Sequence, residues 1–254
     1  MKTFHLKGWD AHLRYHDLPG PGLPLVFVHG FGCASSCDFP RVAADPGLGP
    51  RRRLLVDLLG SGFSDAPAGF SYAMEAHARC LDDLLEGLQL LQVDLYGHSM
   101  GGAVAIELAA LRPGRVRRLV LSEPALDPAV SSSMRAIAGQ SEAEYVSRGQ
   151  GALVRAALQE GNPIWAGTLG ASAAHAIHRE AVARCQGRTP TWRALLESLE
   201  VPRHVLFGGH SLPHPDFTGL PGRGMRVDTV PGAGHSMMWE NPAGLARALR
   251  RALA

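Results

Sequence analysis

The chain has 254 residues, of which 46% are hydrophobic and 19% charged, a composition typical of one folded globular unit and not of collagen-like or largely disordered proteins. Its 25 basic and 23 acidic residues give a net charge of +2, which excludes the strongly basic surface of a dedicated nucleic-acid-binding protein. No apolar stretch has the length of a signal peptide or a membrane span, so we expect a soluble cytoplasmic protein without a membrane partner. The arginines at residues 51–53 are interpreted as a solvated loop ahead of a strand.

Short apolar runs alternate with longer helical patterns along the chain. The first two strands, at residues 4–8 and 12–17, are predicted to form a hairpin. Six further strands are predicted at residues 25–30, 53–58, 93–98, 115–123, 203–209 and 225–232. Helices are predicted at residues 74–91, 100–111 and 242–253, the last capped by Asn241. This alternation predicts an α/β fold with a mostly parallel sheet and flanking helices.

The alternation breaks between Asp127 and Glu200. Helical segments follow one another there, at residues 134–138, 142–159, 172–186 and 192–199. We interpret residues 127–200 as an inserted all-helical cap without independent stability, and residues 1–126 and 201–254 as the core. An insertion between two sheet strands is expected to lie over the carboxyl edge of the sheet, where α/β sheets bind ligands.

The strongest chemical signal is GHSMGG at residues 97–102, a G-x-S-x-G sequence between a predicted strand and a predicted helix. This context is that of the nucleophile elbow, in which glycines allow a sharp turn that projects a serine above the sheet. Ser99 is therefore predicted to be a nucleophile. A glycine-rich turn without a catalytic role is the alternative.

A second motif, HGFG at residues 29–32, directly follows a predicted strand. Acyl transfer needs backbone N–H groups aimed at the developing oxyanion, and the positions of Phe31 and Met100 predict that they supply them. His29 is interpreted as a structural hydrogen-bonding residue of this turn. Cys33 is interpreted as a packed thiol, with a substrate-facing thiol as the alternative.

A third motif, PGAGHS at residues 231–236, lies between the last predicted strand and the last helix. The order of a triad in this architecture is nucleophile, acid and then histidine. His235 is the only histidine after His214, so it is predicted to be the base for Ser99.

With DLLGSGFSD at residues 57–65, these motifs make the whole chain resemble the α/β-hydrolase superfamily with a helical cap. Leu59 stands where many relatives carry arginine. The resemblance implies hydrolysis of a small-molecule substrate through an acyl-enzyme, without a metal or organic cofactor. The oligomeric state is left open.

The acid of the triad departs from the common pattern of this family. Many relatives carry an aspartate shortly after the seventh strand, where this chain has Ser211. Some relatives carry the acid at the end of the sixth strand, and Glu123 follows the apolar run there, at the carboxyl edge of the sheet. Glu123 is therefore the predicted acid, Asp216 and then Asp127 are the alternatives, and Asp228 lies inside a predicted strand.

Cysteine and histidine spacing gives no sign of a disulfide framework or a metal site. The four cysteines, at positions 33, 37, 80 and 185, form no CxxC pair and are interpreted as reduced thiols. His175 and His178 lie in a helical pattern, and the chain contains no HExxH sequence. We predict no metal ligands.

A serine in the elbow disfavours the aspartate-dependent dehalogenases and epoxide hydrolases of the same family. The predicted activity is cleavage of a carboxylic ester, lactone or thioester. Hydrolysis of a carbon–carbon bond in a diketone or ring-cleavage product, or ligand binding without catalysis, are the alternatives. Charges in the predicted cap are balanced, which gives no support for a strongly charged substrate, and we expect a small apolar one. Trp165, Met237 and Met238, with Met134 and Ile164, are the predicted pocket residues, and ordinary core packing is the alternative for them.

Overall fold

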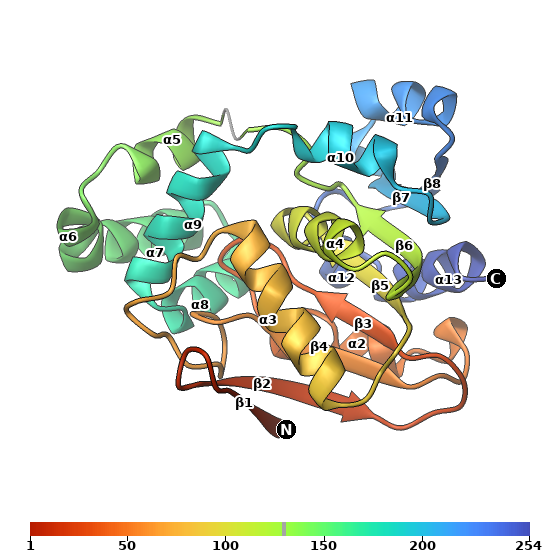
Figure 1. Ribbon diagram of the computed structural model, residues 1–254. Coiled ribbons are helices and arrows are strands. Elements are labelled where there is room, and N and C mark those ends of the chain that lie inside the picture. Colours follow the sequence, from red (N-terminus) through yellow and green to blue (C-terminus); the bar gives the residue numbers. More distant parts are fainter. Residues whose placement is uncertain (129–130) are drawn as a thin grey trace.

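Eight strands form one mixed sheet (Figure 1). The computed structural model describes residues 1–128 and 131–254. The strands are β1 (Lys2–Leu6), β2 (Ala11–Leu18), β3 (Leu25–Val28), β4 (Arg53–Asp57), β5 (Val93–His98), β6 (Val116–Ser122), β7 (Arg203–Gly208) and β8 (Arg226–Val230). Each predicted strand is present, and its ends differ from the prediction by no more than two residues.

The strand order is β1-β2-β4-β3-β5-β6-β7-β8. As predicted, β1 and β2 form an antiparallel hairpin, and β2 also pairs antiparallel with β4. The other pairs are parallel. The carboxyl ends of six parallel strands therefore share one edge, and the loops that carry the sequence motifs meet there.

Both faces of the sheet are buried by helices. On β3, Val26 and Val28 belong to one hydrophobic core, whereas Leu25 and Phe27 belong to the other. Such continuously apolar strands are typical of a parallel sheet covered on both sides. The first face is covered by α3 (Met74–Gly87), α4 (Met100–Leu111) and α10 (Trp192–Ser198). The second is covered by α2 (Pro40–Ala44), which follows α1 (Ser35–Asp38), and by α12 (Met237–Glu240) and α13 (Pro242–Ala252).

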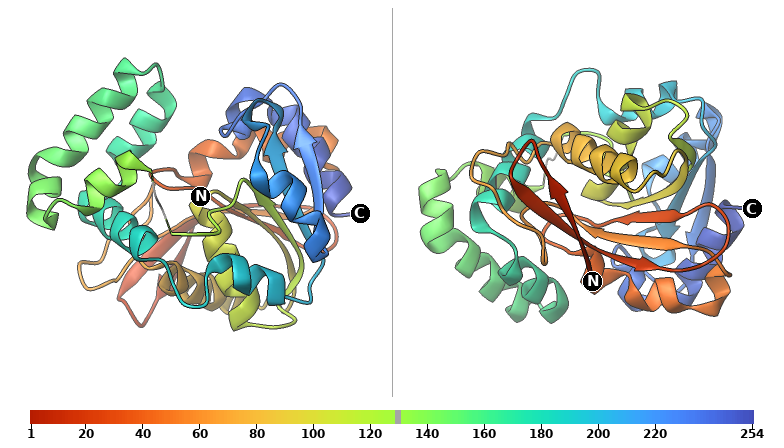
Figure 2. Two further views of the ribbon diagram at one scale, coloured as in Figure 1. Left: turned by 90° about the horizontal axis from the view of Figure 1, so that it is seen from above. Right: turned by 60° about the horizontal axis from the view of Figure 1, so that its bottom comes forward.

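A helical region is inserted between β6 and β7, as predicted. It contains α5 (Ser132–Ala138), α6 (Glu142–Glu144), a π-helical turn (Tyr145–Gly149), α7 (Gln150–Gln159), α8 (Pro163–Ala171) and α9 (Ala174–Gln186). Figure 2 shows these helices gathered at one end of the molecule, opposite the C-terminal helix. The helix α8 was not predicted, although Asn162 caps it and Pro163 occupies its first turn, a combination typical of helix starts.

The helix α10 lies within the predicted cap range of residues 127–200 but packs on the core. Trp192 and Leu196 belong to the same hydrophobic core as α4, and Trp192 Nε1 donates a hydrogen bond to Glu107 Oε1 at 2.9 Å. The helices that stand away from the sheet are therefore α5 to α9 (Figure 2).

Shorter elements complete the chain. A helix α11 (Pro215–Gly219) follows β7, and 3₁₀ turns lie at Pro46–Leu48, Gly209–Ser211 and Pro221–Arg223. Within residues 1–128 and 131–254, no helix combines the length and apolarity needed to cross a membrane.

The arginine run before β4 is held by carboxylates of the sheet. Arg51 Nη2 lies 3.3 Å from Asp94 Oδ2, and Arg52 Nε donates to Asp17 Oδ1 at 2.9 Å. The prediction of a solvated loop is wrong for these two side chains, because the ends of β2 and β5 place their carboxylates beside the loop.

Candidate active site

Ser99 stands at the turn between β5 and α4. Its backbone has φ 51° and ψ −117°, a conformation that residues other than glycine rarely adopt. The neighbouring glycines make this turn possible: a Cβ on Gly101 would lie 2.3 Å from the backbone oxygen of His29. The sequence GHSMGG therefore forms the sharp strand-to-helix turn that was predicted for it.

Backbone hydrogen bonds fix Ser99 to the end of β6. The Ser99 N–H donates to the Ser122 carbonyl at 3.0 Å, and the Ala125 N–H donates to the Ser99 carbonyl at 3.0 Å. Between these two contacts lies Glu123, whose own N–H donates to the Leu206 carbonyl at 3.0 Å. The serine and the glutamate therefore emerge at the same edge of the sheet, as the strand pattern predicted.

The carboxylate of Glu123 contacts His235. His235 Nδ1 lies 2.7 Å from Glu123 Oε2, and the Gly208 N–H donates to Oε1 at 2.9 Å. Burial by itself raises the pKa of Glu123, but interactions with His235, Ser211 and Gly208 outweigh burial and lower this pKa to about 2. An ionised carboxylate only accepts hydrogen bonds, so Nδ1 is the donor, and Nε2 of His235 is left as an acceptor.

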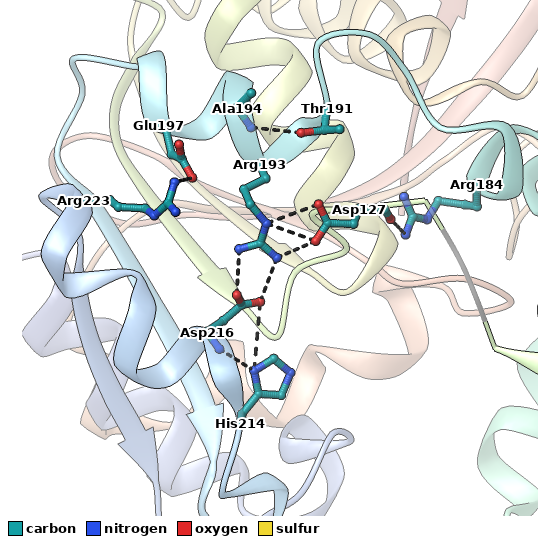
Figure 3. A network of polar contacts seen from close by, with 9 residues as sticks. All are labelled: Asp127, Arg184, Thr191, Arg193, Ala194, Glu197, His214, Asp216 and Arg223. Atoms are coloured by element: carbon teal, nitrogen blue, oxygen red, sulfur yellow. Dashed lines mark hydrogen bonds and ion pairs between the residues drawn. The ribbon is translucent and has the colours of Figure 1, made fainter.

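The competing carboxylates are held elsewhere. Arg193 binds Asp127 through Nε at 3.1 Å and Asp216 through Nη1 at 2.6 Å (Figure 3). These hydrogen bonds raise the pKa of Arg193. Asp228 accepts from an arginine of α13 at 3.0 Å. Glu123 is thus the one of the four considered carboxylates that the structure brings to His235. We call the Asp127–Arg193–Asp216 group the Arg193 clasp.

His98 is a site residue that the sequence analysis did not single out. Its ring centroid lies 4.7 Å from that of His235, and its Nδ1 lies 2.8 Å from Ser122 Oγ, which also contacts Tyr96. Burial, followed by the nearby His235, lowers the pKa of His98 well below its ordinary value. This lowering favours the neutral form of His98. Its place next to Ser99 in the G-x-S-x-G sequence is the signal that could have identified it.

The two predicted oxyanion donors flank the serine. Met100 is the first residue of α4, whose first N–H groups have no partner within the helix. Phe31 lies in the loop after β3. Its neighbour Gly30 is close to the serine, because a Cβ added to Gly30 would lie 3.3 Å from Ser99 Cβ. Among the described residues, neither the Phe31 nor the Met100 N–H donates a hydrogen bond.

His29 ties this loop to its neighbour, as expected of a structural residue. Its Nε2 accepts from the Leu58 N–H at 3.0 Å, so its Nδ1 is the donor to the Gly30 carbonyl at 2.9 Å. Both ring nitrogens of this fully buried histidine are therefore used by the backbone. This leaves His29 no capacity to act as a base.

A cavity of about 560 Å³ lies between the inserted helices and the core, and both Ser99 and His235 line it. Ser99 Oγ and His235 make no direct hydrogen bond in this structure, and such bonds are often long before substrate binds. The inserted helices contribute mainly apolar side chains, Met134, Ile164 and Trp165. The core side of the cavity thus carries Ser99 and His235, whereas the side formed by the inserted helices is mainly apolar.

Four of the five predicted pocket residues line the cavity, and Met134 and Ile164 are among them. Trp165 does so while its Nε1 donates to the Phe31 carbonyl at 3.1 Å, and Met238 does so from α12. Met237 requires a correction. It is fully buried in the hydrophobic core beneath α13 and is not among the cavity-lining residues, because successive positions of α12 point in different directions.

The remaining thiols and histidines have local explanations. Cys33 lines the cavity, and burial followed by the charge of Asp38 raises the pKa of its thiol well above the ordinary value. All four cysteines are unpaired thiols. His175 lies 3.3 Å from the Tyr72 hydroxyl, whereas His178 donates to the Gln140 carbonyl at 2.8 Å.

Comparison with known proteins identifies the family. The family model described as alpha/beta hydrolase fold matches residues 24–188. A 2-hydroxy-6-oxo-2,4-heptadienoate hydrolase from Pseudomonas putida is 40% identical over 107 residues, which are 42% of this chain and 38% of that protein. A 2-hydroxymuconate semialdehyde hydrolase from a Pseudomonas species is 38% identical over 107 residues, again 42% of this chain and 38% of that protein. The matched segment thus spans about two-fifths of the length of these relatives.

Solved structures resemble the chain over nearly its whole length. An esterase from Thermogutta terrifontis, with malate bound, superposes with a TM-score of 0.82 at 24% identity and covers 99% of this chain and 97% of its own. The enol-lactonase from Burkholderia xenovorans LB400 superposes with a TM-score of 0.82 at 22% identity and covers 99% of both chains. The strand order, the elbow at Ser99 and the family match agree, and the chain belongs to the alpha/beta hydrolase fold family.

Proposed function

We propose that the protein is a serine hydrolase that cleaves a carboxylic ester, lactone or thioester through an acyl-enzyme. The observation that carries this proposal is the 2.7 Å contact between His235 Nδ1 and Glu123, at the sheet edge where Ser99 occupies its elbow. Ser99 is the nucleophile, His235 the general base, and Glu123 the carboxylate that orients the imidazole.

In this mechanism, Ser99 Oγ attacks the carbonyl carbon of the substrate while His235 Nε2 accepts the serine proton. The carbonyl oxygen becomes negatively charged, and the backbone N–H groups of Phe31 and Met100 stabilise it. The tetrahedral intermediate collapses as His235 gives its proton to the leaving alcohol or thiol. Water then attacks the acyl-enzyme by the same steps, releases the acid and restores Ser99.

The inserted helices give this chemistry its selectivity. Within the predicted cap range of residues 127–200, we assign the helices α5 to α9 as the cap that controls access to the cavity. Trp165 is the main contact for the apolar part of the substrate, because its side chain lines the cavity. Its Nε1 donates a hydrogen bond to the Phe31 carbonyl, in the loop after β3. Met238 contributes from the core side.

Hydrolysis of a carbon–carbon bond is the second candidate, favoured by the identity to the two Pseudomonas hydrolases. The name of the first relative specifies a carboxylate substrate, a heptadienoate. In the present chain, however, the described residues lining the cavity include no lysine or arginine, whereas Asp38 and Glu240 are among them. A cavity with two carboxyl groups and no lysine or arginine among its described lining residues opposes the binding of an anion, so cleavage of an uncharged ester or lactone is the better-supported function.

A fluorophosphonate probe tests whether the site is catalytic. We expect the folded protein to be labelled and the Ser99→Ala variant to remain unlabelled, because the probe reacts only with an activated serine. A panel of p-nitrophenyl esters, lactones, acyl thioesters and vinylogous diketones then separates the reaction classes. No labelling of the folded protein, beside a labelled control hydrolase, would support ligand binding without catalysis instead.

A further inference from the structure

A histidine in the wall of the cavity has one ring nitrogen without a partner in the described part of the chain. His98 lines the cavity directly before Ser99 and is 4% exposed. Its Nδ1 lies 2.8 Å from Ser122 Oγ, whereas its Nε2 makes no hydrogen bond to the described residues. Nε2 is also not among the partnerless side-chain atoms that the protein encloses completely. Nε2 therefore retains accessible surface, and the space that His98 lines is the cavity.

A buried chain of hydrogen bonds determines which ring nitrogen of His98 carries the proton. Tyr96 Oη lies 2.7 Å from Ser122 Oγ, which in turn contacts His98 Nδ1, and both hydroxyl groups belong to fully buried residues. These two contacts can use two hydrogens. If Nδ1 is unprotonated, Tyr96 donates to Ser122, Ser122 donates to Nδ1, and both hydroxyl hydrogens are used. If Nδ1 were protonated, three hydrogens would share two contacts, and one would be buried without an acceptor.

The proton of the neutral ring is therefore on Nε2. Burial lowers the pKa of His98 and favours its neutral form, which carries a single proton. The ring edge that carries Nε2 lies beside the nucleophile, since a Cβ added to Gly30 would lie 3.2 Å from His98 Cδ2 and 3.3 Å from Ser99 Cβ. His98 thus presents a fixed N–H donor to the cavity near Ser99.

We propose that the Nε2–H of His98 binds an uncharged acceptor oxygen of the substrate, so that the natural substrate is an ester or lactone with a second carbonyl group near the scissile bond. A carbonyl oxygen needs only a donor, whereas a hydroxyl group also needs an acceptor for its own hydrogen. This inference rests on the proposed function and deepens it by naming a polar feature of the substrate.

The other ring N–H groups in the cavity wall already have acceptors. Trp165 Nε1 donates to the Phe31 carbonyl at 3.1 Å, and Trp239 Nε1 donates to Asp38 Oδ1 at 3.1 Å. A purely apolar ester would cover the Nε2–H of His98 without giving it an acceptor, which costs binding free energy. Sites built to hydrogen-bond a substrate discriminate strongly against the analogue that lacks the group.

The test compares two pairs of esters in which a ketone carbonyl replaces one CH₂ group. Methyl 4-oxopentanoate and methyl pentanoate test the acyl side, whereas 2-oxopropyl butanoate and propyl butanoate test the alcohol side. The measured quantity is the ratio of kcat/KM within each pair. Comparing this ratio between the wild type and His98→Phe cancels the intrinsic reactivity of each ester. We expect the ratio to fall by about tenfold or more in His98→Phe for at least one pair.

Tyr96→Phe is the matched control, because it removes a hydrogen bond of the same buried chain but leaves Ser122 to donate to His98 Nδ1. This variant should keep the wild-type ratio, and thermal unfolding shows whether each variant is folded. The proposal is overturned if His98→Phe keeps the wild-type ratio for both pairs, which includes an equal loss of rate for both members. It is also overturned if Tyr96→Phe lowers the ratio as fully as His98→Phe.

Nitrogen NMR of the histidine rings tests the proposal without a change at residue 98. The Ser99→Ala variant is used, because it lacks the nucleophile and leaves added esters intact. We expect His98 Nε2 to be protonated and Nδ1 unprotonated, and the Nε2–H signal to shift when a ketone-containing ester is added. A proton on Nδ1, or an equal response to both members of each pair, overturns the proposal.

The two experiments together separate this inference from the proposed function. If the ketone-containing esters shift the Nε2–H signal of His98 but the wild type hydrolyses no ester, the serine hydrolase is rejected and the donor is retained. If the wild type hydrolyses esters and His98→Phe keeps the wild-type ratio, the donor is rejected and the serine hydrolase is retained.

Discussion

Replacing Glu123 with glutamine changes the charge of the proposed triad while keeping the shape of the side chain. The Gly208 N–H donates to Glu123 Oε1, and His235 contacts Oε2. In the variant, Gly208 still needs an acceptor, so the amide oxygen faces Gly208 and the amide NH₂ faces His235. An NH₂ group only donates, so it forces Nδ1 of His235 to accept and moves the imidazole proton to Nε2. The nitrogen needed to accept the serine proton is then already protonated.

The size of the effect follows from these contacts. The pKa of Glu123 is lowered from 4.5 to about 2, so the surroundings of this side chain favour its ionised form over its protonated form by roughly 3 kcal/mol at most. His235 is one of three residues that lower this pKa, so loss of the charge near the imidazolium by itself corresponds to at most roughly a 10²-fold loss of rate. The inverted tautomer adds to it, and the corresponding Asp-to-Asn change in a serine protease lowers kcat by about 10⁴-fold. We expect a loss near that larger value for Glu123→Gln.

The assay is kcat for a p-nitrophenyl ester at saturating substrate, with thermal unfolding to show that the variant is folded. Asp216→Asn is the matched control, since its carboxylate belongs to the Arg193 clasp and does not contact His235. We expect this control to stay within about tenfold of the wild type. An active Glu123→Gln beside an inactive, folded Asp216→Asn would refute the reasoning and return the acid to the position after β7.

Because the folded-state pKa of Glu123 is lowered to about 2, its ionised form stabilises the protein above about pH 4.5. This stabilisation should disappear as the pH falls toward 2. Urea unfolding of the wild type and of Glu123→Gln across that pH range measures the difference. Gly101→Ala should lower the unfolding free energy by about 3 kcal/mol or more, because its Cβ meets the backbone oxygen of His29, and chemical denaturation measures this. Trp165→Phe should alter relative kcat/KM among acyl chain lengths several-fold with little loss of stability, because it releases only the hydrogen bond to Phe31; an unchanged profile would leave Trp165 a packing residue.

The parts of the fold that rest on local sequence could be predicted. Apolar runs of strand length marked all eight strands, and glycines around Ser99 marked the elbow, because only a few residue types permit that backbone. Glu123 was identified by its position at a strand end, where parallel strands bring their carboxyl ends together. These features depend on a residue and its immediate neighbours.

Features that depend on distant pairs could not be predicted in the same way. The partners of Arg193 lie 66 and 23 positions away, and nothing in the local pattern connects them. The contact between Asp38 and Trp239 spans 201 positions. Met237 and Met238 are adjacent and chemically identical, so only the packing of α12 separates the core residue from the cavity residue.

The Arg193 clasp bears on how freely the inserted segment of this chain can change. Asp127 lies just after β6 and Arg193 lies in α10, so their contact holds together the two points where the chain leaves and rejoins the core (Figure 3). Because β6 and β7 also pair directly, the segment between them can change in length or sequence with little strain on the sheet. The same core can therefore carry different inserted segments, and a short linker between residues 127 and 191, which keeps Trp192 in the core, should yield a folded scaffold with a more accessible site for engineering.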